Sequence, residues 1–208
     1  MRRRNLFKAI SAVLTICMVI SLMAITVPFT VAAANIVYYV DAVNGSDQNN
    51  GTDMGTAWKT LDKVNSLTFG PGDQILLKRG CTWTGVLYPK GSGVSGNPIR
   101  IGAYGTGNLP LINGNGKRYN PLTNDRVDAA IYFNNQSHIT VESIAVTNEI
   151  PDTLPHEIPY DFSSVDDRQG IHFDGSTAGT LTGITIRNCE VYRVANDVNA
   201  SEHGRMAG

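Results

Sequence analysis

An internal repeat constrains the fold of this chain more than any other feature. One unit covers residues 131–147 and a second covers residues 171–192. When the units are aligned, every apolar position of the first meets an apolar position of the second. The matched pairs are Ile131 with Ile171, Phe133 with Phe173, Ile139 with Ile184, Val141 with Ile186, Ile144 with Cys189, and Val146 with Val191. Each unit therefore predicts three very short strands with alternating apolar side chains.

Strands this short restrict the possible architectures. A three-residue strand is not stable alone or in a simple hairpin. It becomes stable when the next coil supplies a matching strand in register, because stacked coils bury a continuous aliphatic column. Two polar residues divide the second and third strands, and Asn188 in the second unit suits the left-handed conformation of a tight turn. The repeat thus predicts an all-β solenoid, a parallel β-helix. A two-sheet sandwich is the alternative, but its strands are usually longer and do not repeat as a unit.

The segment before the repeat predicts further short strands and one helix. Strands are expected at 74–77, 85–88, 99–101 and 111–112, separated by turns rich in glycine and asparagine. The helix is expected between Thr56 and Leu67, where apolar residues recur every third position. Thr56 would cap its start. An amphipathic helix here would cover the open N-terminal end of the solenoid.

The first 34 residues predict a secretory signal peptide. A basic head that includes Arg2 and Lys8 precedes an apolar run, and three alanines end at Ala34. Cleavage after Ala34 would give a secreted protein with no stable membrane insertion. An uncleaved membrane anchor is the alternative, because the run is nearly long enough to span a bilayer. Residues 35–208 would form one domain, with a cap over about 35–72 and coils from about 73, incomplete at the C-terminus.

Charge and cysteine content exclude several functional classes. The first 34 residues hold four of the 17 basic residues and none of the 18 acidic ones, so 13 basic and 18 acidic residues remain. This balance argues against nucleic-acid binding, which needs a basic face. Nucleotide-binding motifs are absent from the sequence, so we expect no organic cofactor. Cys189 occupies an apolar position of the repeat, which predicts a buried free thiol. We expect a monomer.

Several motifs resemble the start of secreted right-handed parallel β-helix proteins of the pectate-lyase-like superfamily. They are YYVDAVNGSD at 38–47, AWKTL at 57–61, PGDQILL at 71–77, NPIRIGAYG at 97–105 and PLING at 110–114. The resemblance implies right-handed coils and an extracellular polysaccharide as partner. It implies foremost a polysaccharide lyase that cleaves a uronate polymer by β-elimination. A glycoside hydrolase on the same scaffold is one alternative, and a non-catalytic glycan-binding or cell-surface protein is another. In this superfamily the catalytic groups usually lie on central coils, so a third alternative is an inactive portion of the enzyme that lacks the catalytic coils.

Alternation along the strands indicates which side chains point outward. It places Tyr132 and His172 on one outer face, one above the other, with Asp174 beside them. It also predicts a cross-coil ion pair between Glu142 and Arg187.

The polar insertion at 148–169 flanks this face and supplies further candidates. We predict Arg168 and His172 as catalytic residues. The predicted saccharide contacts are Tyr132, Tyr160, Phe162 and Asp174, and the predicted Ca²⁺ ligands are Asp166, Asp167 and Asp174. In a lyase, Ca²⁺ would bind the uronate carboxylate while a basic group removes the adjacent proton. In a hydrolase, two carboxyl groups would flank the bond. The ordinary alternative is a solvated surface loop. The acid-rich segment 41–53 could likewise bind calcium or form a hydrogen-bonded turn network.

Overall fold

The computed structural model describes residues 35–117, 127–149 and 168–194, which are mostly strand. The predicted signal peptide, Tyr160, Phe162, Asp166 and Asp167 lie outside the described residues. The elements are β1 (Val37–Val40), a 3-10 turn η1 (Met54–Thr56), α2 (Leu61–Asn65), β2 (Gln74–Lys78), β3 (Thr82–Thr84), β4 (Ile99–Tyr104), β5 (Leu111–Asn113), β6 (Ala129–Asn134), β7 (Ile139–Glu142), β8 (Ala145–Thr147), β9 (Gln169–Asp174), β10 (Thr185–Arg187) and β11 (Glu190–Val191). The helices in these ranges are too short to cross a membrane.

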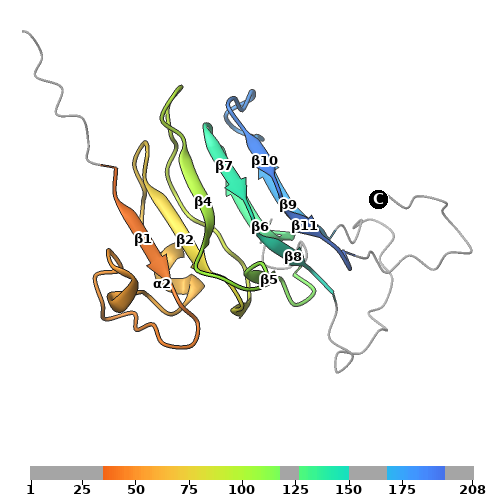
Figure 1. The fold of residues 1–208 in the computed structure, drawn as a ribbon. Coiled ribbons are helices and arrows are strands. Elements are labelled where there is room, and N and C mark those ends of the chain that lie inside the picture. Colours follow the sequence, from red (N-terminus) through yellow and green to blue (C-terminus); the bar gives the residue numbers. More distant parts are fainter. Residues whose placement is uncertain (1–34, 118–126, 150–167, 195–208) are drawn as a thin grey trace, which may run out of the picture. The chain divides into compact units, whose positions relative to one another are not determined.

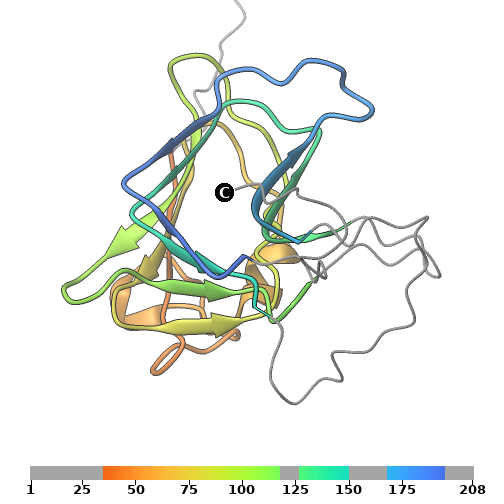
Figure 2. The ribbon, with the colours of Figure 1, turned by 90° about the vertical axis from the view of Figure 1, so that its right-hand side faces the viewer.

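The strands stack in parallel into three sheets. One sheet has the order β1-β2-β4-β7-β10, the second has the order β3-β5-β8-β11, and the third pairs β6 with β9 (Figure 1). Viewed along the stack, successive turns of chain lie over one another around a common interior (Figure 2). Val141 pairs with Ile186, and Ile131 with Ile171, as vertical neighbours. The prediction of stacked coils is therefore confirmed, and the fold is β-helix-like.

The interior consists of the apolar columns that the repeat predicts. Ile101, Val141 and Ile186 form one column, and the first two are fully buried. Phe133 stacks on Phe173 with 4.4 Å between ring centroids. Full burial of one such side chain stabilises the fold by about 1.5–3 kcal/mol. Ile186 is 48% exposed, because no described coil lies beyond it.

The two-residue turn between the second and third strands has the predicted left-handed residue. Asn188 has a φ of 53°, and Ser143 has a φ of 57° at the matching position one coil earlier. The predicted ion pair is also present, with Arg187 Nη2 2.5 Å from Glu142 Oε2. Glu142 additionally pairs with Arg100 from the preceding coil, which the sequence did not indicate.

The predicted N-terminal capping helix over 56–67 is wrong in extent. Only the five residues of α2 are helical, and the residue that caps them is Thr60, whose hydroxyl accepts a hydrogen bond from Lys63 N. Trp58 lies in extended backbone, because its N–H donates to Tyr39 O and it bridges β1 in parallel. The apolar residues Trp58, Leu61 and Val64 are all buried, as the spacing predicts. They lie on an extended segment followed by a single helical turn, and not on one continuous helix.

The predicted strand at 85–88 is reduced to a single bridge between Leu87 and Ile131. The side chain of Asn65 takes the place of ladder hydrogen bonds there. Its amide donates to Val86 O at 2.8 Å and its carbonyl accepts from Tyr88 N at 2.6 Å. β3, earlier in the same coil, is a separate strand that the sequence did not indicate, and it pairs with β5 in the second sheet.

The acid-rich segment forms a hydrogen-bonded turn network. Asp41 accepts hydrogen bonds from the backbone N–H groups of Val43 and Asn44 and pairs with Lys78 Nζ at 2.6 Å. Burial alone would raise the pKa of Asp41, but Lys78 and these backbone donors lower it to about 2. Asp47 similarly accepts from Lys59 N and Thr60 N. The carboxylates therefore hold the loop to the first coil.

Both cysteines in the described residues are free thiols. Cys81 is buried, and its sulfur lies 3.7 Å from Asp41 Oδ1. Cys189 packs against the core but is only half-buried, which differs from the predicted full burial. The reason is its place in the last described coil, where the neighbouring Ile186 is exposed as well.

Candidate functional site

The outer face of β6 and β9 holds a column of aromatic rings. Tyr132 and His172 are register partners on the two strands, with ring centroids 5.3 Å apart in an edge-to-face arrangement. The predicted stacking of these two residues is confirmed. Tyr88 extends the column from the preceding coil, with its ring centroid 5.1 Å from that of Tyr132. Three successive coils thus contribute one continuous stack of aromatic rings, with Tyr132 buried in the middle.

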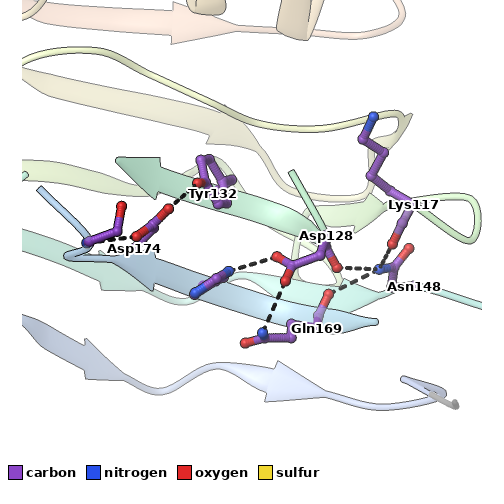
Figure 3. A network of polar contacts seen from close by, with 8 residues as sticks. Lys117, Asp128, Tyr132, Asn148, Gln169 and Asp174 are labelled. Carbon is purple, nitrogen blue, oxygen red and sulfur yellow. Dashed lines mark hydrogen bonds and ion pairs between the residues drawn. The ribbon is translucent and has the colours of Figure 1, made fainter. Parts of the chain in front are cut away.

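Asp174 closes one end of this face through Tyr132 (Figure 3). The Tyr132 hydroxyl donates to Asp174 Oδ2 at 2.8 Å, and Ser176 N donates to Oδ1 at 2.8 Å. These donors lower the pKa of Asp174, the backbone N–H of Ser176 foremost. Burial and the bond to Asp174 raise the pKa of Tyr132. Asp174 is therefore ionised at neutral pH, which suits a hydrogen-bond acceptor rather than a proton donor.

Asp128 holds His172 at the other end of the face. Oδ1 of Asp128 lies 2.6 Å from Nδ1 of His172, and Oδ2 accepts from Gln169 Nε2 at 3.2 Å (Figure 3). The hydrogen bond to Asp128 raises the pKa of His172, although partial burial opposes this. An imidazole with a carboxylate partner is oriented through one ring nitrogen, which leaves the other nitrogen for a ligand.

Sequence reasoning missed Asp128, although one signal pointed to it. Residue 128 has the same parity as Tyr132 along the strand direction, so alternation places it on the outer face. The sequence repeat, however, begins only at Ile131, and the strand begins two residues earlier at Ala129. The repeat therefore did not indicate where β6 begins, and Asp128, the partner of His172, was not predicted.

The structure brings three of the predicted site residues together. Tyr132, His172 and Asp174 share the β6–β9 face, and Tyr132 is only 1% exposed, so its ring supports the face from within. Arg168 lies directly before β9 and is 6% exposed. Among residues 35–117, 127–149 and 168–194, no group of three or more acidic, histidine or cysteine side chains could hold a metal ion.

Comparison with known proteins points to enzymes that cleave glycosidic bonds. A lacto-N-biosidase from Bifidobacterium longum subsp. longum is 26% identical over 201 aligned residues, which cover 81% of this chain and 13% of that protein. The crystal structure of a GH136 lacto-N-biosidase from Eubacterium ramulus matches 77% of this chain with 28% identity and a TM-score of 0.64. The native form of that crystal structure matches with a TM-score of 0.58. Both relatives are glycoside hydrolases. No family model matches the chain.

The chain spans only part of these relatives. It covers about an eighth of the Bifidobacterium protein and 27% of the Eubacterium chain. The similarity therefore concerns a portion of each enzyme.

The expected resemblance to the pectate-lyase-like superfamily is wrong. The relatives found are GH136 lacto-N-biosidases, whose fold is itself a β-helix. The motifs behind that expectation lie in the first coils and the loop that covers them, where Asp41 and Asp47 make their structural hydrogen bonds. Such motifs report how a β-helix begins and carry no information on the reaction. The comparisons support the hydrolase alternative and give the lyase interpretation no support.

Proposed function

We propose that this chain forms part of an exported glycoside hydrolase that acts on glycans containing a lacto-N-biose unit. The observation that carries the proposal is the match to the Eubacterium ramulus lacto-N-biosidase, with 28% identity and a TM-score of 0.64 over 77% of the chain. Identity at this level together with a shared fold supports a shared reaction class, whereas a shared fold alone would not. The right-handed sense of the coils belongs to the same proposal, since crossovers between parallel strands are nearly always right-handed.

The β6–β9 face would bind the glycan. Asp174 is an ionised acceptor for sugar hydroxyl groups. The ring nitrogen of His172 opposite its bond to Asp128 can contact a second hydroxyl. The partly exposed ring of Tyr88 offers an apolar surface to the C–H face of a pyranose. Tyr88 belongs to the first coil of the aromatic column, and His172 and Asp174 both lie on β9 in the third, so the three groups would follow an extended sugar chain across the coils.

The hydrolytic step itself needs two carboxyl groups, one protonated and one ionised. The low pKa of Asp174 suits the ionised role or a binding role. Asp174, Asp166 and Asp167 are also proposed as Ca²⁺ ligands. Loss of activity when a chelator is added would support this role.

The experiment compares products from two substrates. The purified protein is incubated with an oligosaccharide ending in lacto-N-biose and, separately, with a uronate polymer. Hydrolysis is expected to release the disaccharide with a new reducing end, and no unsaturated product that absorbs in the ultraviolet. His172→Ala and Asp174→Ala should weaken the reaction at least tenfold, while Glu190→Ala on the exposed β11 serves as the matched control.

Two outcomes would contradict the proposal. An ultraviolet-absorbing product from the uronate polymer would restore the lyase interpretation. Binding of the oligosaccharide without any release of disaccharide would identify a non-catalytic glycan-binding protein.

A further inference from the structure

Asn148 lies directly after β8 and connects three separate segments through one side-chain amide. It is fully buried. Its Nδ2 donates to Lys117 O at 2.7 Å and to Gln169 O at 3.0 Å, and Asp128 O lies at 3.4 Å (Figure 3). Lys117 follows β5, Asp128 precedes β6, and Gln169 begins β9. One amide therefore fixes the distance between the end of one sheet and the starts of both strands of another.

The neighbouring coil is shaped to leave room for this amide. Gly114 lies beside Asn148, and its N–H donates to Thr147 O at 2.8 Å. A Cβ atom at Gly114 would lie 2.3 Å from Asn148 Oδ1, closer than any real contact. A larger residue at position 114 would displace the amide.

The orientation of the amide leaves one of its two polar atoms without a hydrogen bond among the described residues. This atom is the buried Asn148 Oδ1. Reversing the amide would aim this oxygen at the three carbonyl oxygens that Nδ2 now serves, which is repulsive. A buried acceptor without a partner is unfavourable. An apolar side chain of similar volume would fill the same space without this unfavourable oxygen, so the amide donor is the feature that favours asparagine here.

The two carbonyl groups nearest the site link the amide to His172. The carboxylate of Asp128 contacts both His172 Nδ1 and Gln169 Nε2, while the backbone carbonyls of Asp128 and Gln169 face Asn148 Nδ2. The relative position of these two backbone segments therefore determines whether Asp128 reaches His172.

We propose that Asn148 is a positioning residue, whose amide holds the starts of β6 and β9 at the spacing at which Asp128 contacts His172. Its importance for turnover rests on the proposed function of the β6–β9 face, but its effect on His172 does not. The charged or titratable groups near His172 are Asp128 before β6, Tyr132 on β6 and Asp174 on β9. Loss of the amide would relax the contact with Asp128 and leave Tyr132 and Asp174 in place.

The test is an NMR titration of the His172 imidazole in the intact chain, which needs no substrate. Asn148→Val removes the donor and the unpaired oxygen at similar volume, and Asn148→Thr has the same shape but retains one donor. The pKa of His172 should fall towards its usual value in Asn148→Val and fall less in Asn148→Thr. Ile112→Val, a conservative change to a buried core residue on β5, should leave the titration unchanged.

A His172 titration in Asn148→Val that superimposes on that of the unmodified protein would overturn the proposal. If Asn148→Val does not fold, Asn148→Thr decides in the same way. An equal fall in the pKa of His172 in Ile112→Val would also overturn it, because the effect would then be general loosening. Failure of the unmodified protein to cleave any glycan would contradict the proposed function and leave this result intact.

Discussion

His172 and Asp128 are 44 positions apart in the sequence, and their side chains meet with 2.6 Å between Nδ1 and Oδ1. β9 stacks on β6 with His172 opposite Tyr132, and Asp128, directly before β6, reaches the same imidazole along the strand direction. The contact fixes the imidazole through one nitrogen and raises its pKa. The charge on the β6–β9 face should therefore depend on this pair.

Asp128→Asn should lower the pKa of His172 towards 6.5, its usual value. A histidine whose folded-state pKa is raised adds stability that is fully present below the unfolded-state pKa and is lost as pH rises through the folded-state value. The unmodified protein should thus exceed Asp128→Asn in free energy of unfolding by about 1 kcal/mol near pH 5. The difference should shrink above pH 8. Urea unfolding at a series of pH values measures it, and a difference that grows with pH would contradict the assignment.

Tyr132→Phe should raise the pKa of Asp174 while keeping the aromatic column. The phenol donates one of the hydrogen bonds that stabilise the Asp174 carboxylate, and a backbone donor from Ser176 remains. The loss of one partly buried hydrogen bond should cost about 1 kcal/mol of stability. Carboxyl-carbon NMR titration measures the first effect and thermal unfolding the second. An unchanged Asp174 titration would show that the backbone donor alone sets its ionisation.

Two isoleucines in one column should differ sharply when truncated. Ile101 is fully buried below Val141, and Ile186 above it is 48% exposed. Ile101→Ala should cost about 2–5 kcal/mol, because it leaves a cavity in a closed interior. Ile186→Ala should cost under about 1.5 kcal/mol, since much of its side chain already contacts water. Equal losses in chemical denaturation would indicate that the end of the stack is covered in solution.

The stacked columns were predictable from sequence, because apolar matching between 131–147 and 171–192 fixes both strand register and coil stacking. The ends of elements were not. Trp58 satisfies a helical spacing, but the hydrogen bond from its N–H to Tyr39 O holds it extended. Local periodicity cannot detect a partner 19 positions earlier in the chain.

The candidate site was predictable only where it follows alternation. Tyr132, His172 and Asp174 were placed on one face from parity alone, whereas Asp128 and Asn148 lie just outside the repeat. Asn148 acts through its amide on three distant carbonyl groups. Contacts of that kind depend on where loops begin and end, and the repeat carries no information about these boundaries.

Glu142 connects three coils, and its removal should destabilise the fold in a pH-dependent way. It pairs with Arg100 from one coil and Arg187 from the next. Burial alone would raise the pKa of Glu142, but the hydrogen bonds from both arginines lower it below its usual value of 4.5. A carboxylate with a lowered folded-state pKa adds stability that is present above the unfolded-state pKa and is lost as pH falls through the folded-state value.

Glu142→Gln should therefore cost about 1–2 kcal/mol at pH 7 and progressively less below pH 4.5. The two arginines should contribute unequally to the free energy of unfolding. The Arg187 side chain is 60% exposed and that of Arg100 is 35% exposed. Of the two, only Arg100 also donates to Gln74 Oε1, at 2.6 Å. Arg187→Ala should cost about 0–1 kcal/mol, as exposed ion pairs do, and Arg100→Ala should cost more. Urea unfolding of the three variants at pH 7 and pH 3 measures this order. A larger loss for Arg187→Ala would mean that the exposed end of the stack is shielded from solvent.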